Sequence, residues 1–218
     1  MKSLLVAIFV LFFARGIIAQ NRIDSCYKDF NAPSTNTYYW PSDTEVGVYF
    51  SRNLFTHAQQ QSLLEAMKSW NAAAAQSGSG VKFFYLGESN GIQVCDRCLT
   101  ITRREVHKHD HQHYAFFRPL QRDKDGLLVS AWIDIDFATT DAKALQGFMV
   151  HELGHSLGLS DCTRCKKKTT IMNGFPGINE DNGLIAPSNC DVEVVKEIYR
   201  MHRPVEGIVA GATSRHEQ

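Results

Sequence analysis

The stretch HELGHSLGLSD, residues 151–161, is the part of the sequence from which both the fold and the chemistry of this chain can be predicted. It completes an apolar pattern over residues 142–158 that predicts a helix ending at Gly158. Side chains four positions apart lie on the same face of a helix, one turn from each other. We therefore expect the imidazoles of His151 and His155 to lie side by side, with the carboxylate of Glu152 next to them.

Two histidines at this spacing can bind one metal ion without straining the backbone. Zinc in hydrolytic sites takes three protein ligands and leaves a fourth position open. Gly158 can adopt a positive φ and reverse the chain, which would bring Asp161 back toward the same metal. A carboxylate is an accepted zinc ligand, so the predicted ligand set is His151, His155 and Asp161. A bare HExxH occurs by chance in unrelated helices, but the glycine and the acid that follow argue against that alternative.

The rest of the chain predicts a sheet and two further helices. Alternating or apolar stretches predict strands over 45–50, 81–86, 99–106, 113–117 and 127–137. Residues 56–76 predict a long helix, with Thr56 as N-cap and Gln59 completing a capping box. Residues 192–203 predict a C-terminal helix, for which Ser188, Asn189 and Asp191 are candidate caps. This order indicates an α+β fold with a twisted mixed sheet.

The N-terminus has the composition of a secretory signal peptide over residues 1–19. Lys2 precedes an unbroken apolar run from Leu4 to Ala14, shorter than the roughly 20 residues that span a bilayer. The alternative is an uncleaved signal anchor, which is disfavoured because Arg15 interrupts the apolar segment. We therefore predict a secreted protein with no membrane contact after cleavage.

The chain of 218 residues is long enough for one domain with a proper core. We predict a polar N-terminal arm or short propeptide over 20–44, a folded domain over 45–203, and a flexible tail over 204–218. Acidic and basic residues balance at 23 each, so the chain lacks the excess of positive charge that is typical of nucleic-acid-binding proteins, and we expect no nucleic-acid partner. We expect a monomer.

Six cysteines accompany the predicted secretion. Two CxxC pairs, Cys95–Cys98 and Cys162–Cys165, are close enough in sequence to form local disulfides, which would leave Cys26 to pair with Cys190. Disulfides persist in oxidising compartments, so three disulfides are the favoured arrangement. The alternative is that both CxxC pairs form one Cys₄ structural zinc site.

Taken together, these motifs resemble those of the metzincin clan of zinc endopeptidases. The clan motif is HExxHxxG followed two residues later by His or Asp, and then a methionine turn. HELGHSLGLSD matches the first part and TTIMNG around Met172 is similar to the turn. Within the clan, the chain looks closest to matrixin-like secreted proteases, and the aspartate is similar to that of snapalysin-type enzymes.

The resemblance covers roughly residues 45–203 and implies a function. It implies that His151, His155 and Asp161 bind a catalytic zinc ion, and that Met172 forms a hydrophobic floor beneath it. It also implies that Glu152 acts as general base and acid while a metal-activated water hydrolyses a peptide bond. The expected partner is a protein or peptide substrate paired with an edge strand within 113–131. A non-catalytic zinc module and a hydrolase of non-peptide amides or esters are the competing hypotheses.

Two features leave alternatives open. The cysteine-switch motif of vertebrate matrixins is absent, and Cys26 or Asp24 could cap the zinc if the protein is latent. A second structural metal is also conceivable at HKHDHQH, where alternation on a strand would direct four histidines to one face. Its residues are His107, His109, Asp110, His111 and His113. A solvated polar segment is the simpler interpretation of this cluster.

Overall fold

The computed structural model describes residues 38–105, 114–162, 164–166, 168–173 and 184–202. The predicted signal peptide, the 107–113 histidine cluster, the predicted tail and Cys26 lie outside these residues. Within the described part of the chain, no helix is both long enough and apolar enough to cross a membrane.

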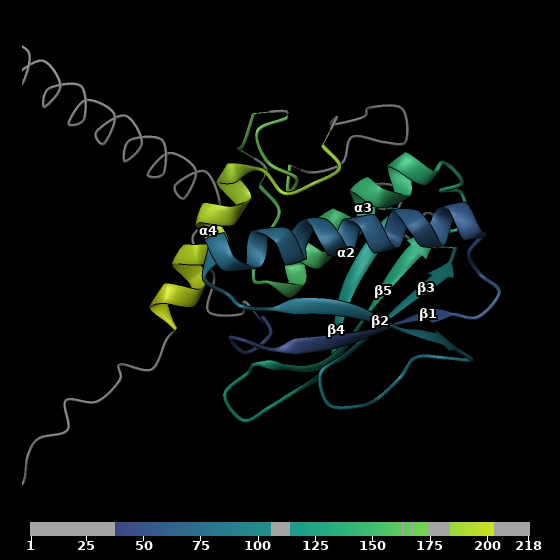
Figure 1. Cartoon of the computed structure of the whole chain (residues 1–218), viewed down its shortest axis with the longest axis horizontal. Helices are drawn as coiled ribbons and strands as arrows, with labels where there is room; N and C mark the ends of the chain where they lie inside the picture. The colour runs from purple at the N-terminus through teal and green to yellow at the C-terminus, as the bar shows by residue number, and fades with distance from the viewer. Residues whose placement is uncertain (1–37, 106–113, 163, 167, 174–183, 203–218) are drawn as a thin grey trace, which may run out of the picture.

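A twisted mixed sheet of five strands forms one layer of the molecule, which confirms the predicted α+β fold (Figure 1). The order across the sheet is β2-β1-β3-β5-β4. Three of the neighbouring pairs are parallel, and only β4 runs antiparallel to its neighbour β5. The strands are β1 Glu45–Ser51, β2 Lys82–Ser89, β3 Cys98–Arg104, β4 Ala115–Arg122 and β5 Leu128–Asp136.

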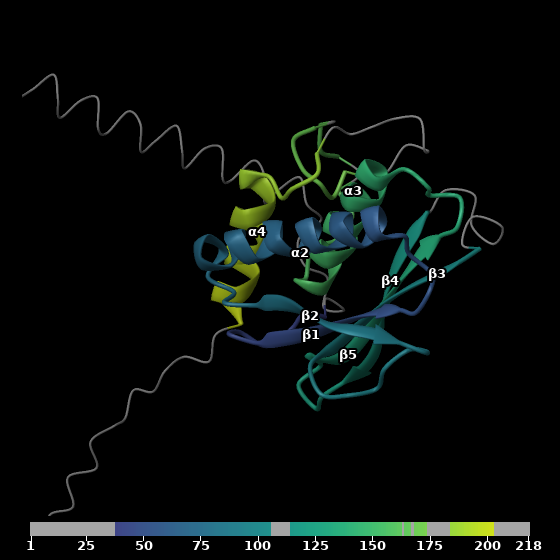
Figure 2. The ribbon, with the colours of Figure 1, turned by 45° about the vertical axis from the view of Figure 1, so that its right-hand side comes forward.

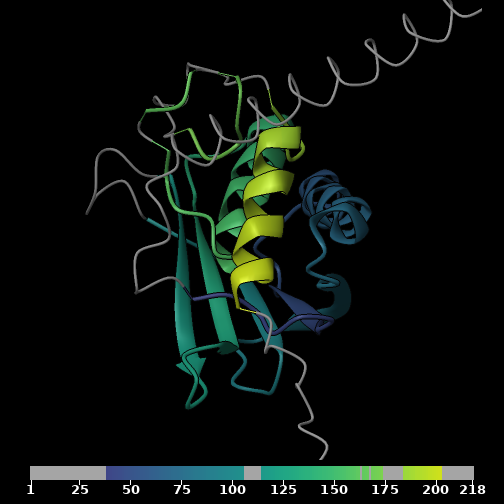
Figure 3. The ribbon, with the colours of Figure 1, turned by 90° about the vertical axis from the view of Figure 1, so that its left-hand side faces the viewer.

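Three helices form the second layer, on one side of the sheet (Figures 1 and 2). They are α2 His57–Ser77, α3 Ala142–Ser156 and α4 Asn189–Met201. The predicted capping box of α2 is present, because Thr56 accepts from the Gln59 backbone while the Gln59 side chain accepts from the Thr56 backbone. Helix α4 begins in the same way with Ser188 and Asp191, and packs against α2, which Figure 3 shows nearly end-on beside it.

The core lies between these two layers. Helix α2 buries a stripe of residues at helical spacing, Leu63, Met67, Trp70 and Ala74. The indole N–H of Trp70 donates to the carbonyl of Val150 in α3 at 2.8 Å. Helix carbonyls usually accept from an N–H of the same helix. The carbonyl of Val150 accepts here from a side chain of another helix, and this bond ties α2 to α3 one residue before the HExxH motif.

Two differences from the predicted elements have physical reasons. Strand β4 continues to Arg122 instead of ending at 117, through Pro119. Proline lacks an N–H but is tolerated on an edge strand, and the register shifts just after it. In addition, the described end of the predicted arm packs into the domain, where Trp40 is fully buried and its carbonyl accepts from the Tyr199 hydroxyl.

Candidate metal centre

The C-terminal turns of α3 carry the two predicted histidines. His151 is buried and His155 is partly exposed, and their ring centroids are 4.8 Å apart at an interplanar angle of 87°. The helix begins at Ala142, and the side chain of Asp141 caps it by accepting from the N–H of Ala144. The expected juxtaposition of the two imidazoles is therefore present in the structure.

A tight reversal at the end of α3 returns the chain toward these histidines. Gly158 has a φ of 93°, in the left-handed region that favours glycine. Its N–H donates to the carbonyl of His155 at 3.0 Å, and the N–H of Leu159 donates to the carbonyl of Gly154 at 3.1 Å. This pair of bonds is the Schellman motif, which satisfies the last helix carbonyls while turning the chain. Asp161 follows three residues later.

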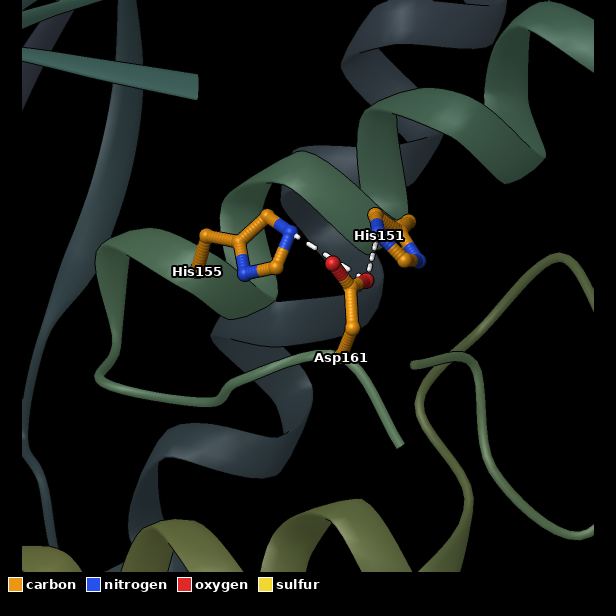
Figure 4. A group of neighbouring side chains, drawn as sticks. All are labelled: His151, His155 and Asp161. Atoms are coloured by element: carbon orange, nitrogen blue, oxygen red, sulfur yellow. Dashed lines mark ion pairs between the residues drawn. The ribbon is translucent and has the colours of Figure 1, made fainter. Parts of the chain in front are cut away.

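The Asp161 carboxylate lies between the two imidazoles (Figure 4). Its Oδ1 is 3.1 Å from Nε2 of His151 and 3.7 Å from Nε2 of His155. Tetrahedral zinc with bonds of about 2.1 Å places its ligand atoms roughly 3.4 Å apart, so the two distances bracket that value. One ligand atom from each of the three side chains lies within 4.8 Å of the others. No second group of this kind occurs among the described residues.

Backbone carbonyls orient both imidazoles. Nδ1 of His151 lies 2.9 Å from the carbonyl of Ile171, and Nδ1 of His155 lies 2.8 Å from the carbonyl of Leu159. A carbonyl can only accept, so each Nδ1 carries the proton and donates. Each Nε2 then carries a lone pair on the side of Asp161, which is the arrangement that metal-binding histidines ordinarily have. These residues therefore fit zinc.

Glu152 lies beside the histidines in an environment that favours its protonated form. The side chain is almost fully buried, and burial raises its pKa from 4.5 to about 7. His155 lowers the pKa, Asp161 raises it, and a hydrogen bond from the Phe117 backbone in β4 lowers it. The carboxyl group is therefore poised near neutral pH, between α3 and the edge strand.

The predicted methionine turn lies against α3. Met172 is fully buried, and a Cβ added to Gly154 would be 2.6 Å from its sulfur. Only a glycine at 154 allows this approach, because such a short contact does not occur between real atoms. The turn thereby packs on the helix segment between the two histidines.

Asp191 connects this turn to α4, which sequence reasoning missed. Its carboxylate accepts from the hydroxyl of Thr170 and from the backbone N–H of Ile171, the latter at 3.0 Å. The carbonyl of the same Ile171 accepts from His151. Asp191 is recognisable in the sequence as a helix cap, but no local spacing relates it to Thr170, 21 residues earlier.

Each CxxC pair forms its own disulfide, Cys95–Cys98 and Cys162–Cys165. The alternative of a shared Cys₄ zinc site therefore does not describe this structure. Cys190 is disulfide-bonded as well, and its predicted partner Cys26 lies outside the described residues. The candidate second metal site at 107–113 also lies outside them.

Comparisons with known proteins identify distant structural likenesses. No protein-family model matches the chain, and no curated protein matches it. The solved structure of myroilysin has a TM-score of 0.42 and 13% identity, covering 74% of this chain and 95% of that one. Archaemetzincin from Methanopyrus kandleri has a TM-score of 0.41 and 12% identity, covering 77% and 97%. Both scores are below 0.5, so the function proposed below rests on the site geometry and the motif.

Proposed function

We propose that this protein is a secreted zinc-dependent endopeptidase. The observation that carries the proposal is that Oδ1 of Asp161 lies 3.1 Å from Nε2 of His151 and 3.7 Å from Nε2 of His155, close to the spacing of tetrahedral zinc ligands. A structural zinc site has no need of a further acidic group, whereas Glu152 is buried directly beside these ligands. The HExxHxxGxxD motif and Met172 support the same assignment through their resemblance to metzincins.

In this proposal His151, His155 and Asp161 hold the ion, and bound zinc supplies the Lewis acid that polarises the substrate carbonyl and activates water. Glu152 takes the proton of the attacking water and then passes it to the leaving amine. One carboxyl group can serve both steps, because the proton that it accepts in the first step is the proton that it donates in the second. The carbonyls of Ile171 and Leu159 keep the two imidazoles oriented throughout.

Strand β4 supports a peptide as the substrate. It lies at the end of the strand order, so one of its edges has no partner strand among the described residues. The Phe117 backbone in this strand bonds Glu152, which indicates that the strand borders the candidate metal centre. An extended peptide could add to such an edge by β-augmentation, which would hold its backbone beside the zinc.

Secretion is supported by the N-terminal apolar run and by the two disulfides of the described residues. Disulfides persist in oxidising compartments such as the extracellular space. Oxidising conditions are therefore appropriate for producing the protein for the test below.

The test is digestion of casein by the zinc-loaded chain from Gln20 onward, alongside Glu152→Gln and a chelator-treated sample. Glu152→Gln keeps the size of the side chain but cannot accept a proton. We expect it to bind zinc like the wild type and to lose activity by roughly 10²-fold or more. A wild-type protein that binds one zinc ion and cleaves neither casein nor a peptide library would contradict the endopeptidase assignment.

A further inference from the structure

Asp161 differs from the other two proposed zinc ligands in how it is supported. His151 and His155 project from a regular helix, whereas Asp161 lies in irregular chain after the reversal at Gly158. Its side chain is 45% exposed, so packing around the carboxylate contributes little to its position. The residues that follow it in the chain can supply further support for this ligand.

Cys162, the next residue, supplies that support. It is fully buried, and its N–H donates to the carbonyl of Met172 at 2.7 Å. Its sulfur is bonded to Cys165, and the carbonyl of Cys165 accepts from the side-chain amide of Asn173. The small disulfide ring is thus attached at both ends to consecutive residues of the methionine turn.

The methionine turn itself is firmly held against the metal centre. Met172 packs on Gly154 between the two histidines, and Ile171 accepts from His151. A ring anchored to this turn therefore ties Asp161 to the same frame that orients the histidines. Ligands held in place before metal binding do not have to be ordered when the metal binds, which raises affinity.

We propose that the Cys162–Cys165 disulfide is a positioning element of the zinc centre that holds Asp161 ready to bind the metal. The inference rests on the proposed zinc site. Opening a four-residue ring releases conformational freedom that corresponds to roughly tenfold in an equilibrium constant. Without the disulfide, part of the binding free energy of zinc would be spent on ordering the Asp161 segment.

The chain contains a matched control, Cys95–Cys98. This disulfide has the same sequence separation of 3, a Cα–Cα distance of 5.6 Å against 5.4 Å, and likewise one buried and one partly exposed cysteine. It lies at the start of β3, where Cys98 pairs with Gly47 and Ser130. None of these elements carries a proposed zinc ligand.

The experiment compares Cys162→Ala/Cys165→Ala with Cys95→Ala/Cys98→Ala and the wild type. Zinc affinity is measured by competition with a chromophoric chelator, and the visible spectrum of the Co²⁺-substituted proteins reports the ligand geometry. We expect the first double variant to bind zinc roughly tenfold more weakly with an altered Co²⁺ spectrum. The second should remain within about twofold of the wild type.

Asn173→Ala covers the case in which the first double variant does not fold. It keeps both cysteines and removes only the bond to the Cys165 carbonyl, so it should weaken zinc binding in the same direction. Wild-type zinc affinity in either folded variant, or an equal loss in the Cys95–Cys98 control, would overturn the inference while leaving the proposed function intact. A wild-type chain that binds no zinc would overturn both.

Discussion

At the scale of single residues, Glu152 illustrates how burial changes the chemistry of a side chain. Its neighbours in the sequence identify it as part of an HExxH motif, but its pKa of about 7 comes mainly from burial in the folded protein. An unfolded chain has this group at its ordinary value of 4.5. The difference makes the stability of the zinc-free protein depend on pH in a defined direction.

Glu152→Gln should remove that pH dependence in the zinc-free protein. A raised pKa in the folded state means that stability is lost as the pH rises from about 4.5 to 7, because only the unfolded chain ionises freely in that window. Glutamine cannot ionise, so the unfolding free energy of the variant relative to wild type should rise by about 3 kcal/mol from pH 4 to pH 8. Urea unfolding in the presence of a chelator measures this difference between the two proteins. A difference that does not vary with pH would refute the raised pKa of Glu152.

At the scale of elements, the close contact between α3 and the methionine turn predicts the effect of adding one methyl group. Gly154→Ala places a Cβ at 2.6 Å from the Met172 sulfur, so the buried Met172 side chain has to shift. Overpacking of this kind costs about 1–3 kcal/mol of unfolding free energy. If the shift of Met172 moves the neighbouring Ile171, whose carbonyl orients His151, zinc affinity should fall as well.

Gly147→Ala is the control for that substitution, in the same helix. A Cβ there would meet only the Leu184 carbonyl, at 3.4 Å. Alanine is favoured over glycine in a helix interior by up to about 1 kcal/mol, so this variant should be neutral or slightly more stable. Equal destabilisation of the two variants in urea would show that the contact with the Met172 sulfur is not the cause of the loss in Gly154→Ala.

The link between α4 and the turn predicts a second effect at this scale. Asp191→Ala removes the acceptor for Thr170 and for the Ile171 N–H, both buried, and for the backbone of Ser188. Buried donors without partners cost about 1–3 kcal/mol each, so we expect a loss of about 2–4 kcal/mol in urea unfolding. Zinc affinity should fall as well.

Ser188→Ala provides the comparison, because it removes the cap hydroxyl of the same helix and leaves the bonds to the turn in place. It should cost only about 1 kcal/mol, as helix caps usually do, with zinc affinity unchanged. Equal zinc binding by the two variants would rule out that Asp191 supports His151 through Ile171.

At the scale of the whole molecule, the proposed zinc joins segments that are far apart in the chain. The ligands end α3 and begin the following loop, and the turn that supports them is held by α4. An ion that binds only the folded protein stabilises it by mass action, by about 2.7 kcal/mol at a hundredfold excess over Kd. For a protein of this size that corresponds to a rise in Tm of roughly 5–10 °C.

Thermal unfolding with and without a chelator measures this rise, and Asp161→Ala is the comparison. The variant keeps both histidines but lacks the carboxylate that approaches them at 3.1 and 3.7 Å, so its zinc-dependent rise in Tm should be much smaller. An equal rise in the two proteins would mean that Asp161 is not a ligand.

The sequence alone determined those features that depend on residues near one another in the chain. Helical spacing predicts that His151 and His155 share a face, Gly158 predicts the reversal before Asp161, and Thr56 with Gln59 predicts the start of α2. The structure contains all of these, because hydrogen bonds and side-chain contacts within a few residues set them. The number, type and order of the elements in the described residues follow from the same local patterns.

Only the tertiary structure decided what lies between distant segments. The strand order that leaves β4 at an edge, the sulfur of Met172 against Gly154, and the bonds from Asp191 to the methionine turn have no signature in local spacing. These contacts exist because chain segments that are tens of residues apart pack around one core. The proposed ligands therefore all lie within eleven consecutive residues, 151–161. The methionine turn and α4, which help to hold them, come from later segments of the chain.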